Sequence, residues 1–432
     1  MPARRRCSLR SDGGAEGATV AMTARSSAGA FRVMRRVDGF LGPPLCLALS
    51  ALQSLLRRLR HRAGRTPAAV ANILVIKFWG MGSIVLTTPM LRALKAAYPG
   101  ARITFLTFDH NVPLCRALPA IDRVYPYRAA SPTAFVRSLI ALVRFLRRER
   151  FDIAIDLEFF ANFTAIIAGI AGAPVTIGYD GPKRWRRPFY TNRFSFDYKH
   201  ITEVFLKAAQ TLGAEVCGTH LDAPVVDDEL RAARLNQLLR DRGVAAADRL
   251  ICININASPL EYKRRWPLPA YKALIERLLD AYGGFRLVLV GSREDTAYVD
   301  VLVGLLGTDT RLVNLCGVID VEQLVLLLGR AHLYIGNDSG PLHIAVALGT
   351  PTVSFFGPET PVLYGPRGGA HTVLYKNIPC SPCLDVYNSK ENPFCQNNLC
   401  MQAIGLEEAW AAVRKRLMEA PATVARMAAG SP

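Results

Sequence analysis

The N-terminal 70 residues lack two features of exported and membrane-spanning proteins. No apolar segment directly follows the first arginines, so we expect no secretory signal peptide. The uncharged stretch at residues 39–56 is shorter than the roughly 20 apolar residues that a spanning helix needs. Pro43 and Pro44 interrupt it and leave only residues 45–56 as uninterrupted helix. A helix lying on the membrane surface therefore fits this stretch better than a span.

The same region also lacks lysine. Residues 1–70 contain 13 arginines and only three acids, a net charge of +10 out of +18 for the whole chain. We expect residues 1–34 to be a disordered basic tail. Residues 35–66 fit an amphipathic segment lying on a membrane surface, with arginines at the lipid headgroups. The alternative is an amphipathic helix packed on the globular body.

The rest of the chain lacks internal repeats of 20–50 residues, which argues against a solenoid. Apolar runs alternate instead with helical patterns, which predicts an α/β fold with parallel sheets. One series starts near residue 71 and a second near residue 250. We expect two Rossmann-like, doubly wound domains, 71–225 and 248–415, facing each other across a cleft.

The second series contains the segment GNDSGPLHIAVALGTP at residues 336–351. A strand runs into Asp338, and Ser339 and Pro341 suit the cap and the first turn of a following helix. The free amides of that helix favour an anion, such as the diphosphate of a nucleotide-sugar. His343 can face this ligand. The alternatives are a helix cap for Asp338 and a core histidine for His343.

Two other turns of the same domain also favour phosphate. NASPLEYKRRWP, residues 256–267, offers Ser258 and the cations Lys263, Arg264 and Arg265 after a strand. VLVGSRED, residues 288–295, offers Gly291 after another strand. Three such turns favour a nucleotide site over three solvated loops.

Two further segments are rich in one residue type. Cys380, Cys383, Cys395 and Cys400 have a spacing that is typical of structural zinc, although reduced or paired thiols fit equally. PKRWRRPFY, residues 182–190, has four basic residues around a tryptophan, which suits either an anionic acceptor or an exposed loop. No basic stripe with an aromatic stacking platform is evident, so we expect no nucleic-acid partner.

These motifs together resemble glycosyltransferase family 9, the ADP-heptose:lipopolysaccharide heptosyltransferases, over residues 71–415. The specific matches are ILVIKFWGMGSIVLTTPMLRAL, NASPLEYKRRWP and above all the segment at 336–351. The resemblance implies a GT-B architecture and metal-independent, inverting transfer. It implies that Asp338, Ser339, Gly340, Pro341, Leu342 and His343 form the donor loop. It also implies that Lys263 or Arg264, more than Arg265, contacts the donor phosphates.

The chain departs from the family at residues 80–83. Gly80, Met81 and Gly82 form the expected acceptor-side turn, but Ser83 stands where the family has an aspartate, its usual candidate for general base. A serine cannot accept the acceptor's proton unaided. Glu158, at the end of the strand FDIAIDLEFF, is our first candidate for the base.

Asp156 on the same strand and Asp109 are the weaker candidates for the base. We therefore expect a cytoplasmic, peripheral membrane enzyme that transfers heptose or a related sugar from a nucleotide-diphosphosugar to an anionic glycolipid. It would need no cofactor for catalysis. The alternatives are a non-catalytic binding protein of the same architecture and a nucleotide-sugar epimerase or hydrolase.

Overall fold

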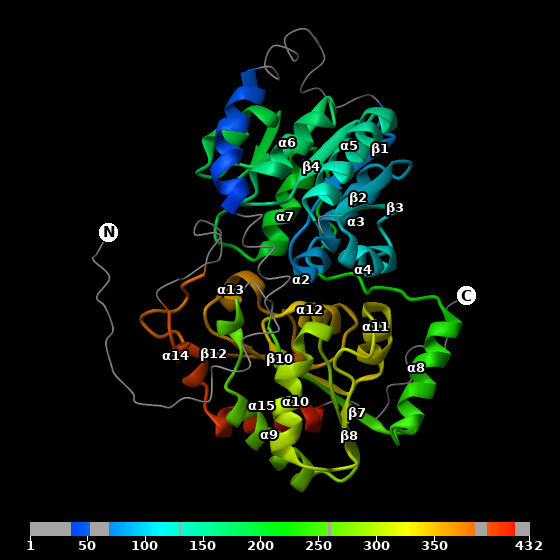
Figure 1. Ribbon diagram of the computed structural model, residues 1–432, viewed down its shortest axis with the longest axis vertical. Helices are drawn as coiled ribbons and strands as arrows, with labels where there is room; N and C mark the ends of the chain where they lie inside the picture. The colour runs from blue at the N-terminus through cyan, green and yellow to red at the C-terminus, as the bar shows by residue number, and fades with distance from the viewer. Residues whose placement is uncertain (1–35, 52–68, 129–130, 258–260, 385–394, 420–432) are drawn as a thin grey trace.

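A computed structural model describes residues 36–51, 69–128, 131–257, 261–384 and 395–419. Within these ranges the chain forms two sheets of six parallel strands each, and helices cover them (Figure 1). The predicted α/β class with two doubly wound domains is confirmed. The expected basic tail at 1–34 and the second half of the segment 35–66 lie outside the described residues.

The N-terminal sheet has the strand order β3-β2-β1-β4-β5-β6. Its strands are β1 (Asn72–Ile76), β2 (Arg102–Phe108), β3 (Arg123–Tyr127), β4 (Ile153–Asp156), β5 (Val175–Tyr179) and β6 (Asn192–Phe194). Its helices are α2 (Met81–Val85), α3 (Thr88–Ala97), α4 (Val112–Ala117), α5 (Pro132–Glu149), α6 (Asn162–Ile170) and α7 (Ile201–Gln210), with the 3-10 turns η2 (Asp109–Asn111) and η3 (Arg184–Phe189). The central strands are nearly continuous apolar runs because both faces of the sheet are covered.

The C-terminal sheet has the order β12-β11-β10-β7-β8-β9. Its strands are β7 (Arg249–Asn254), β8 (Phe285–Leu289), β9 (Leu312–Asn314), β10 (Leu333–Asn337), β11 (Thr352–Phe356) and β12 (His371–Tyr375). The helices that come after α7 in the chain are α8 (Glu229–Asp241), α9 (Leu268–Ala281), α10 (Thr296–Leu306), α11 (Val321–Arg330), α12 (Gly340–Ala347), α13 (Pro361–Tyr364), α14 (Leu399–Gln402) and α15 (Leu406–Glu419). The 3-10 turns of this part are η4 (Tyr262–Arg264) and η5 (Arg293–Asp295).

The strand order of each sheet fixes where a ligand can bind. In the N-terminal sheet the order reverses between β1 and β4, and in the C-terminal sheet between β7 and β10. In open parallel sheets the crevice at the carboxyl ends of such neighbouring strands is the usual ligand site. The turns after β1, β4, β7 and β10 are therefore the first places to look for function.

The two domains touch through the first turns of α2 and α12, which face each other in Figure 1. A Cβ atom on Gly82 would lie 2.3 Å from Cδ2 of His343, and one on Gly340 would lie 3.1 Å from Cβ of Met81. Only glycine at these two positions allows the helices to approach this closely. Gly82 thus serves domain contact, in addition to the sugar contact expected from the sequence.

A second contact joins α7 to the loop after α13. Nε2 of His200 lies 3.0 Å from the carbonyl oxygen of Gly365, and Nδ1 accepts a hydrogen bond from the amide of Thr202. Burial, with Arg367 nearby, lowers the pKa of His200 to about 4, so the ring is neutral near pH 7. The ion pair between Arg367 and Glu203, 2.6 Å apart, lies beside it.

Residues 36–51 form a helix beside α6, dark blue in Figure 1. The helix begins before Pro43, so the prediction that it starts after the two prolines is wrong. Those prolines cannot donate to the carbonyls of Gly39 and Phe40, but both residues are exposed and can bond water. Among the described residues, no helix combines the length and the apolar character needed to cross a bilayer.

This helix both packs on the domain and exposes apolar side chains. The carboxylate of Asp38 accepts hydrogen bonds from the amides of Asn162 and Phe163, 2.8 Å each, and so caps the start of α6. Cys46 is buried on the same side. The opposite side exposes Val37, Phe40, Leu41, Leu45 and Leu47, of which Phe40 is 81% exposed.

Candidate active site

A cavity of about 320 Å³ lies between the domains, at the carboxyl ends of the central strands. Twelve of the residues singled out from the sequence line it: Gly80, Met81, Gly82, Ser83, Glu158, Arg264, Gly291, Asp338, Ser339, Gly340, Pro341 and His343. The donor and acceptor motifs therefore converge on one cavity. Leu342 is a fully buried core residue instead, and Lys263 does not line the cavity. Ser258 lies outside the described residues.

The donor loop is anchored by Asn337 at the end of β10. Its side-chain oxygen accepts a hydrogen bond from the amide of Trp266, and its amide group donates to the carbonyl oxygens of Ile255 and Asn256, at 2.9 to 3.0 Å. Asn337 thus holds the turn after β7 against the turn after β10. The next residue, Asp338, enters the cavity.

Helix α12 starts as predicted in one respect and differently in another. Pro341 lies in its first turn. Ser339 is the N-cap residue, but its side chain makes no capping hydrogen bond, so that prediction is wrong. Its hydroxyl lies 3.4 Å from the side-chain nitrogen of Asn254 instead. The first amides of α12 are consequently not satisfied by a cap side chain.

Arg264 is the cation that the structure places at this loop. Its guanidinium lies 3.2 Å from Oδ2 of Asp338 and 3.7 Å from Oε2 of Glu359. Burial opposes its charge, but these carboxylates outweigh burial and raise the pKa of Arg264. Arg265 is used elsewhere, because it pairs with Asp295 at 3.3 Å and lies over the ring of Tyr298. The choice among the three cations therefore falls on Arg264.

Glu158 forms the opposite wall of the cavity, with no exposed surface. Its Oε1 atom accepts three hydrogen bonds, from Nζ of Lys77 (2.8 Å) and from the amides of Phe78 (2.7 Å) and Trp79 (3.0 Å). Its Oε2 atom is buried as well. One oxygen fixes the turn after β1, while the other has no hydrogen-bond partner among the described residues.

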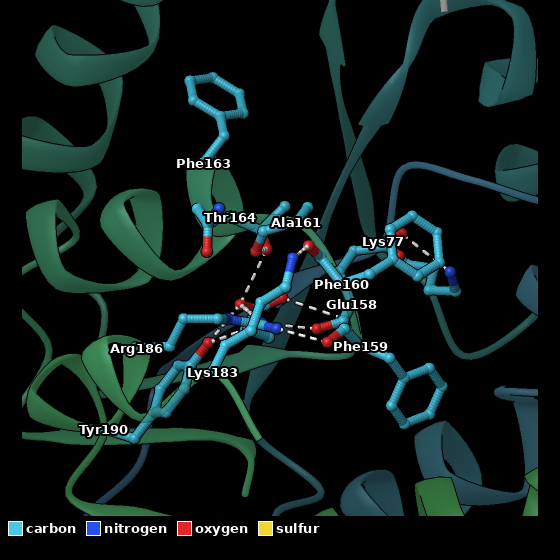
Figure 2. Close-up of polar contacts among 12 residues, drawn as sticks. Lys77, Glu158, Phe159, Phe160, Ala161, Phe163, Thr164, Lys183, Arg186 and Tyr190 are labelled. Atoms are coloured by element: carbon cyan, nitrogen blue, oxygen red, sulfur yellow. Dashed lines mark hydrogen bonds and ion pairs between the residues drawn. The ribbon is translucent and has the colours of Figure 1, made fainter. Parts of the chain in front are cut away.

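Asp156, two residues earlier, belongs to a buried network with Thr164, Arg186 and Tyr190, which are labelled in Figure 2. Its Oδ2 atom accepts hydrogen bonds from Tyr190 (2.6 Å), Thr164 (2.9 Å) and Arg186 (3.1 Å). Burial raises the pKa of Asp156, although Arg186 and Tyr190 oppose the shift. Asp156 does not line the cavity. It holds the loop after β4 in place and does not reach a substrate.

The basic segment 182–190 is largely committed to the same loop. Arg186 is buried and donates to the carbonyl oxygens of Glu158 and Phe159, 2.6 Å each. Lys183 donates to the carbonyl oxygen of Phe160 at 2.6 Å (Figure 2). The sequence suggests either a site for an anionic acceptor or an exposed loop. Neither interpretation describes Lys183 and Arg186, which bind loop carbonyls instead.

Gly80, Ser83 and Asp109 complete the acceptor side. Gly80 has a φ of 83°, which favours glycine at the start of α2. Ser83 lines the cavity from the first turn of α2. Asp109 is exposed in η2 and does not line the cavity, so the structure does not bring this candidate base to the site.

The four clustered cysteines do not support a zinc site. No group of three or more metal-binding side chains is found within the described ranges. Burial, together with the other three thiols of the cluster, raises the pKa of Cys400 to about 12.

Sequence reasoning missed several cavity residues. Lys77 and Trp79 flank the turn after β1, and a lysine ending an apolar strand was the available signal. Ser292 follows Gly291 in the segment VLVGSRED, which the sequence already indicated. The other lining residues come from several loops, and their types alone did not mark them: Phe159, Phe160, Asn254, Asn256, Ala257, Asp295, Ile319, Asp320, Val321, Leu324 and Tyr364.

Comparisons with known proteins give the same assignment. The model of "Glycosyltransferase family 9 (heptosyltransferase)" matches residues 139–393. Lipopolysaccharide heptosyltransferase 3 of Escherichia coli is 27% identical over 296 residues, which cover 66% of this chain and 83% of the relative.

Two solved structures share the fold. The E. coli ADP-heptose lps heptosyltransferase II has a TM-score of 0.64 and 22% identity, covering 81% of this chain and 99% of that chain. The glycosyl transferase family 9 protein of Veillonella parvula DSM 2008 has a TM-score of 0.68 and 23% identity, covering 83% and 100%. Because the family model matches more than half of the sequence, this chain belongs to glycosyltransferase family 9 and is a glycosyltransferase with the GT-B fold.

The buried network predicts a large difference between two arginines of η3. Replacing Arg186 (Arg186→Met) leaves Asp156 buried without its cation, and breaking a buried pair costs about 3–5 kcal/mol. We expect the free energy of unfolding in urea to fall by that amount. Replacing the exposed Arg184 in the same way (Arg184→Met) should change the free energy of unfolding by less than about 0.5 kcal/mol. Equal losses for the two variants would contradict the network.

Proposed function

We propose that this enzyme transfers heptose, or a closely related sugar, from ADP-heptose to a lipopolysaccharide-type glycolipid, with inversion at the transferred carbon. The observation that carries the proposal is the single cavity in which Asp338, Arg264 and the start of α12 face Glu158 and Ser83. The similar proteins are named as lipopolysaccharide and ADP-heptose heptosyltransferases, which supports ADP-heptose as donor and a lipopolysaccharide-type acceptor.

The C-terminal wall holds the donor. The uncapped amides of α12 and the guanidinium of Arg264 would bind the diphosphate, which matches the preference of helix N-termini and arginine for phosphate. Asp338 and Glu359 keep Arg264 in position in the absence of donor. His343, buried at the contact with Gly82, closes the cavity between donor and acceptor sides.

The N-terminal wall holds the acceptor and takes its proton. The acceptor oxygen attacks C1 of the donor sugar as the C1–O bond to the diphosphate breaks. The electron pair leaves with the nucleoside diphosphate, whose charge Arg264 and the α12 amides stabilise. The proton passes to Oε2 of Glu158, the oxygen that has no hydrogen-bond partner in the described part of the chain. Ser83 can donate or accept a hydrogen bond beside the reacting hydroxyl.

The variant Glu158→Gln tests this assignment. Its carbonyl oxygen can still accept from Lys77 and the turn amides, but no carboxylate remains to take the proton. We expect kcat for ADP release from ADP-heptose, with a lipopolysaccharide core acceptor, to fall about 100-fold or more. Calorimetry should show unchanged donor affinity.

The matched control is Asp109→Asn, which changes a carboxylate outside the cavity and should keep the wild-type rate. Wild-type turnover in Glu158→Gln would remove Glu158 from the mechanism. A wild-type enzyme that binds ADP-heptose but never transfers it would favour a binding protein. Release of free sugar alone would favour a hydrolase.

We also propose that the helix at residues 36–51 rests on the inner face of the cytoplasmic membrane, where a lipid-linked acceptor is presented. Its packing side covers α6, and its outer side exposes five apolar side chains. Arg36 precedes this surface, and Arg57, Arg58, Arg60 and Arg62 follow in the sequence. This combination matches an anionic lipid surface.

Vesicle co-sedimentation of the full chain tests this placement. With vesicles containing phosphatidylglycerol, we expect the double variant Phe40→Asp and Leu41→Asp to bind at least tenfold more weakly than wild type, because two inserted side chains are lost. Leu230 on α8 is also exposed, so Leu230→Asp is the matched control and should bind normally. Equal binding by both variants would contradict the placement.

A further inference from the structure

The acceptor side of the cavity is aromatic. Trp79, Phe159 and Phe160 line it together with Met81, all from the turns after β1 and β4. Trp79 and Phe160 have their ring centroids 5.7 Å apart. Both are partly exposed, so they present ring surface to the cavity.

This aromatic wall is held rigidly. The amide of Trp79 donates to Glu158 at 3.0 Å, and its carbonyl oxygen accepts from Nζ of Lys77 at 2.7 Å. The ring of Trp79 packs edge-on against Phe108 at 5.6 Å. The carbonyl oxygen of Phe160 is fixed by Lys183. A wall of this kind is pre-organised and loses little conformational freedom on binding.

The same wall carries no net charge. Its charged lining residues are Lys77 and Glu158, which neutralise each other at 2.8 Å. Arg186 and Lys183, the basic residues nearest in the fold, bind loop carbonyls. On the facing wall, Arg264 is the cation and is shared between two carboxylates, while Asp295 and Asp320 are paired with Arg265 and Arg231. A phosphate on the acceptor ring would meet no uncommitted cation among the described lining residues.

We infer that the acceptor enters this cavity as an uncharged sugar ring whose C–H face stacks on Trp79 and Phe160, with its anionic groups outside the cavity. The inference rests on the proposed function and specifies its acceptor. A sugar ring has one face of C–H groups, and covering it with an aromatic ring removes apolar area from water. The hydroxyl groups at its edge then face Glu158 and Ser83.

Two acceptor analogues and two variants test the inference in the full-length enzyme. The analogues are a methyl heptoside and the same heptoside with a phosphate monoester on its ring. We expect the uncharged heptoside to have a KM at least tenfold lower. Trp79→Ala should raise that KM about tenfold or more with a smaller change in kcat, and Trp79→Phe should restore most of it.

Two direct measurements separate binding from folding and from chemistry. Saturation-transfer NMR should show the ring C–H protons of the uncharged heptoside closest to the wild-type protein and lose that contact in Trp79→Ala. Calorimetry should show the same affinity for ADP-heptose in the wild-type enzyme and in Trp79→Ala. A preference for the phosphorylated heptoside, or an unchanged acceptor KM in Trp79→Ala, would overturn the inference. Absence of ADP release by the wild type with every acceptor would instead contradict the proposed function.

Discussion

The close contact of α2 with α12 is the constraint on which the site depends. Each helix begins at the carboxyl end of a central strand, and glycines at both starts let them meet at van der Waals distance. This contact places Ser83 and Glu158 opposite Asp338 and Arg264 in one cavity. Neither domain alone contains all four of these residues. Transfer between two substrates therefore requires the interface, as expected for an architecture with one substrate on each domain.

The N-terminal domain uses buried charge to shape its side of this cavity. Asp156 and Glu158 are both fully buried at the end of β4, and each has a cation within 3.1 Å. Asp156 and Arg186 hold the loop that carries Phe159 and Phe160, while Lys77 and one oxygen of Glu158 hold the turn that carries Trp79. The charged side chains that the sequence suggests for ligand binding thus hold the two loops in place, and the loops present an aromatic surface to the cavity.

The fold and the location of the site could be predicted because turns at the carboxyl ends of parallel strands share one edge of the sheet. That rule brings the turns after β1 and β4 together in one sheet and the turns after β7 and β10 together in the other, and the expected cleft between two such domains lets the two pairs of turns face each other. It does not say which of three consecutive cations points inward, since Asp295 and Tyr298, which contact Arg265, are about 30 residues away in sequence. It also cannot distinguish a buried arginine such as Arg186 from an exposed one. The spacing of the cysteines predicts a metal site equally well whether or not the thiols converge.

The turnover of Gly82→Ala tests the central claim most directly. A methyl group there would lie 2.3 Å from the ring of His343 and 3.3 Å from Cα of Gly340, so the ring or the two helices must shift. At an overpacking cost of about 1–3 kcal/mol, we expect sugar transfer to slow on the order of 10- to 100-fold while both domains stay folded. Gly100→Ala, where the added carbon has no neighbour within 4 Å, should leave the rate unchanged. Wild-type turnover in Gly82→Ala would contradict an active site assembled by this contact.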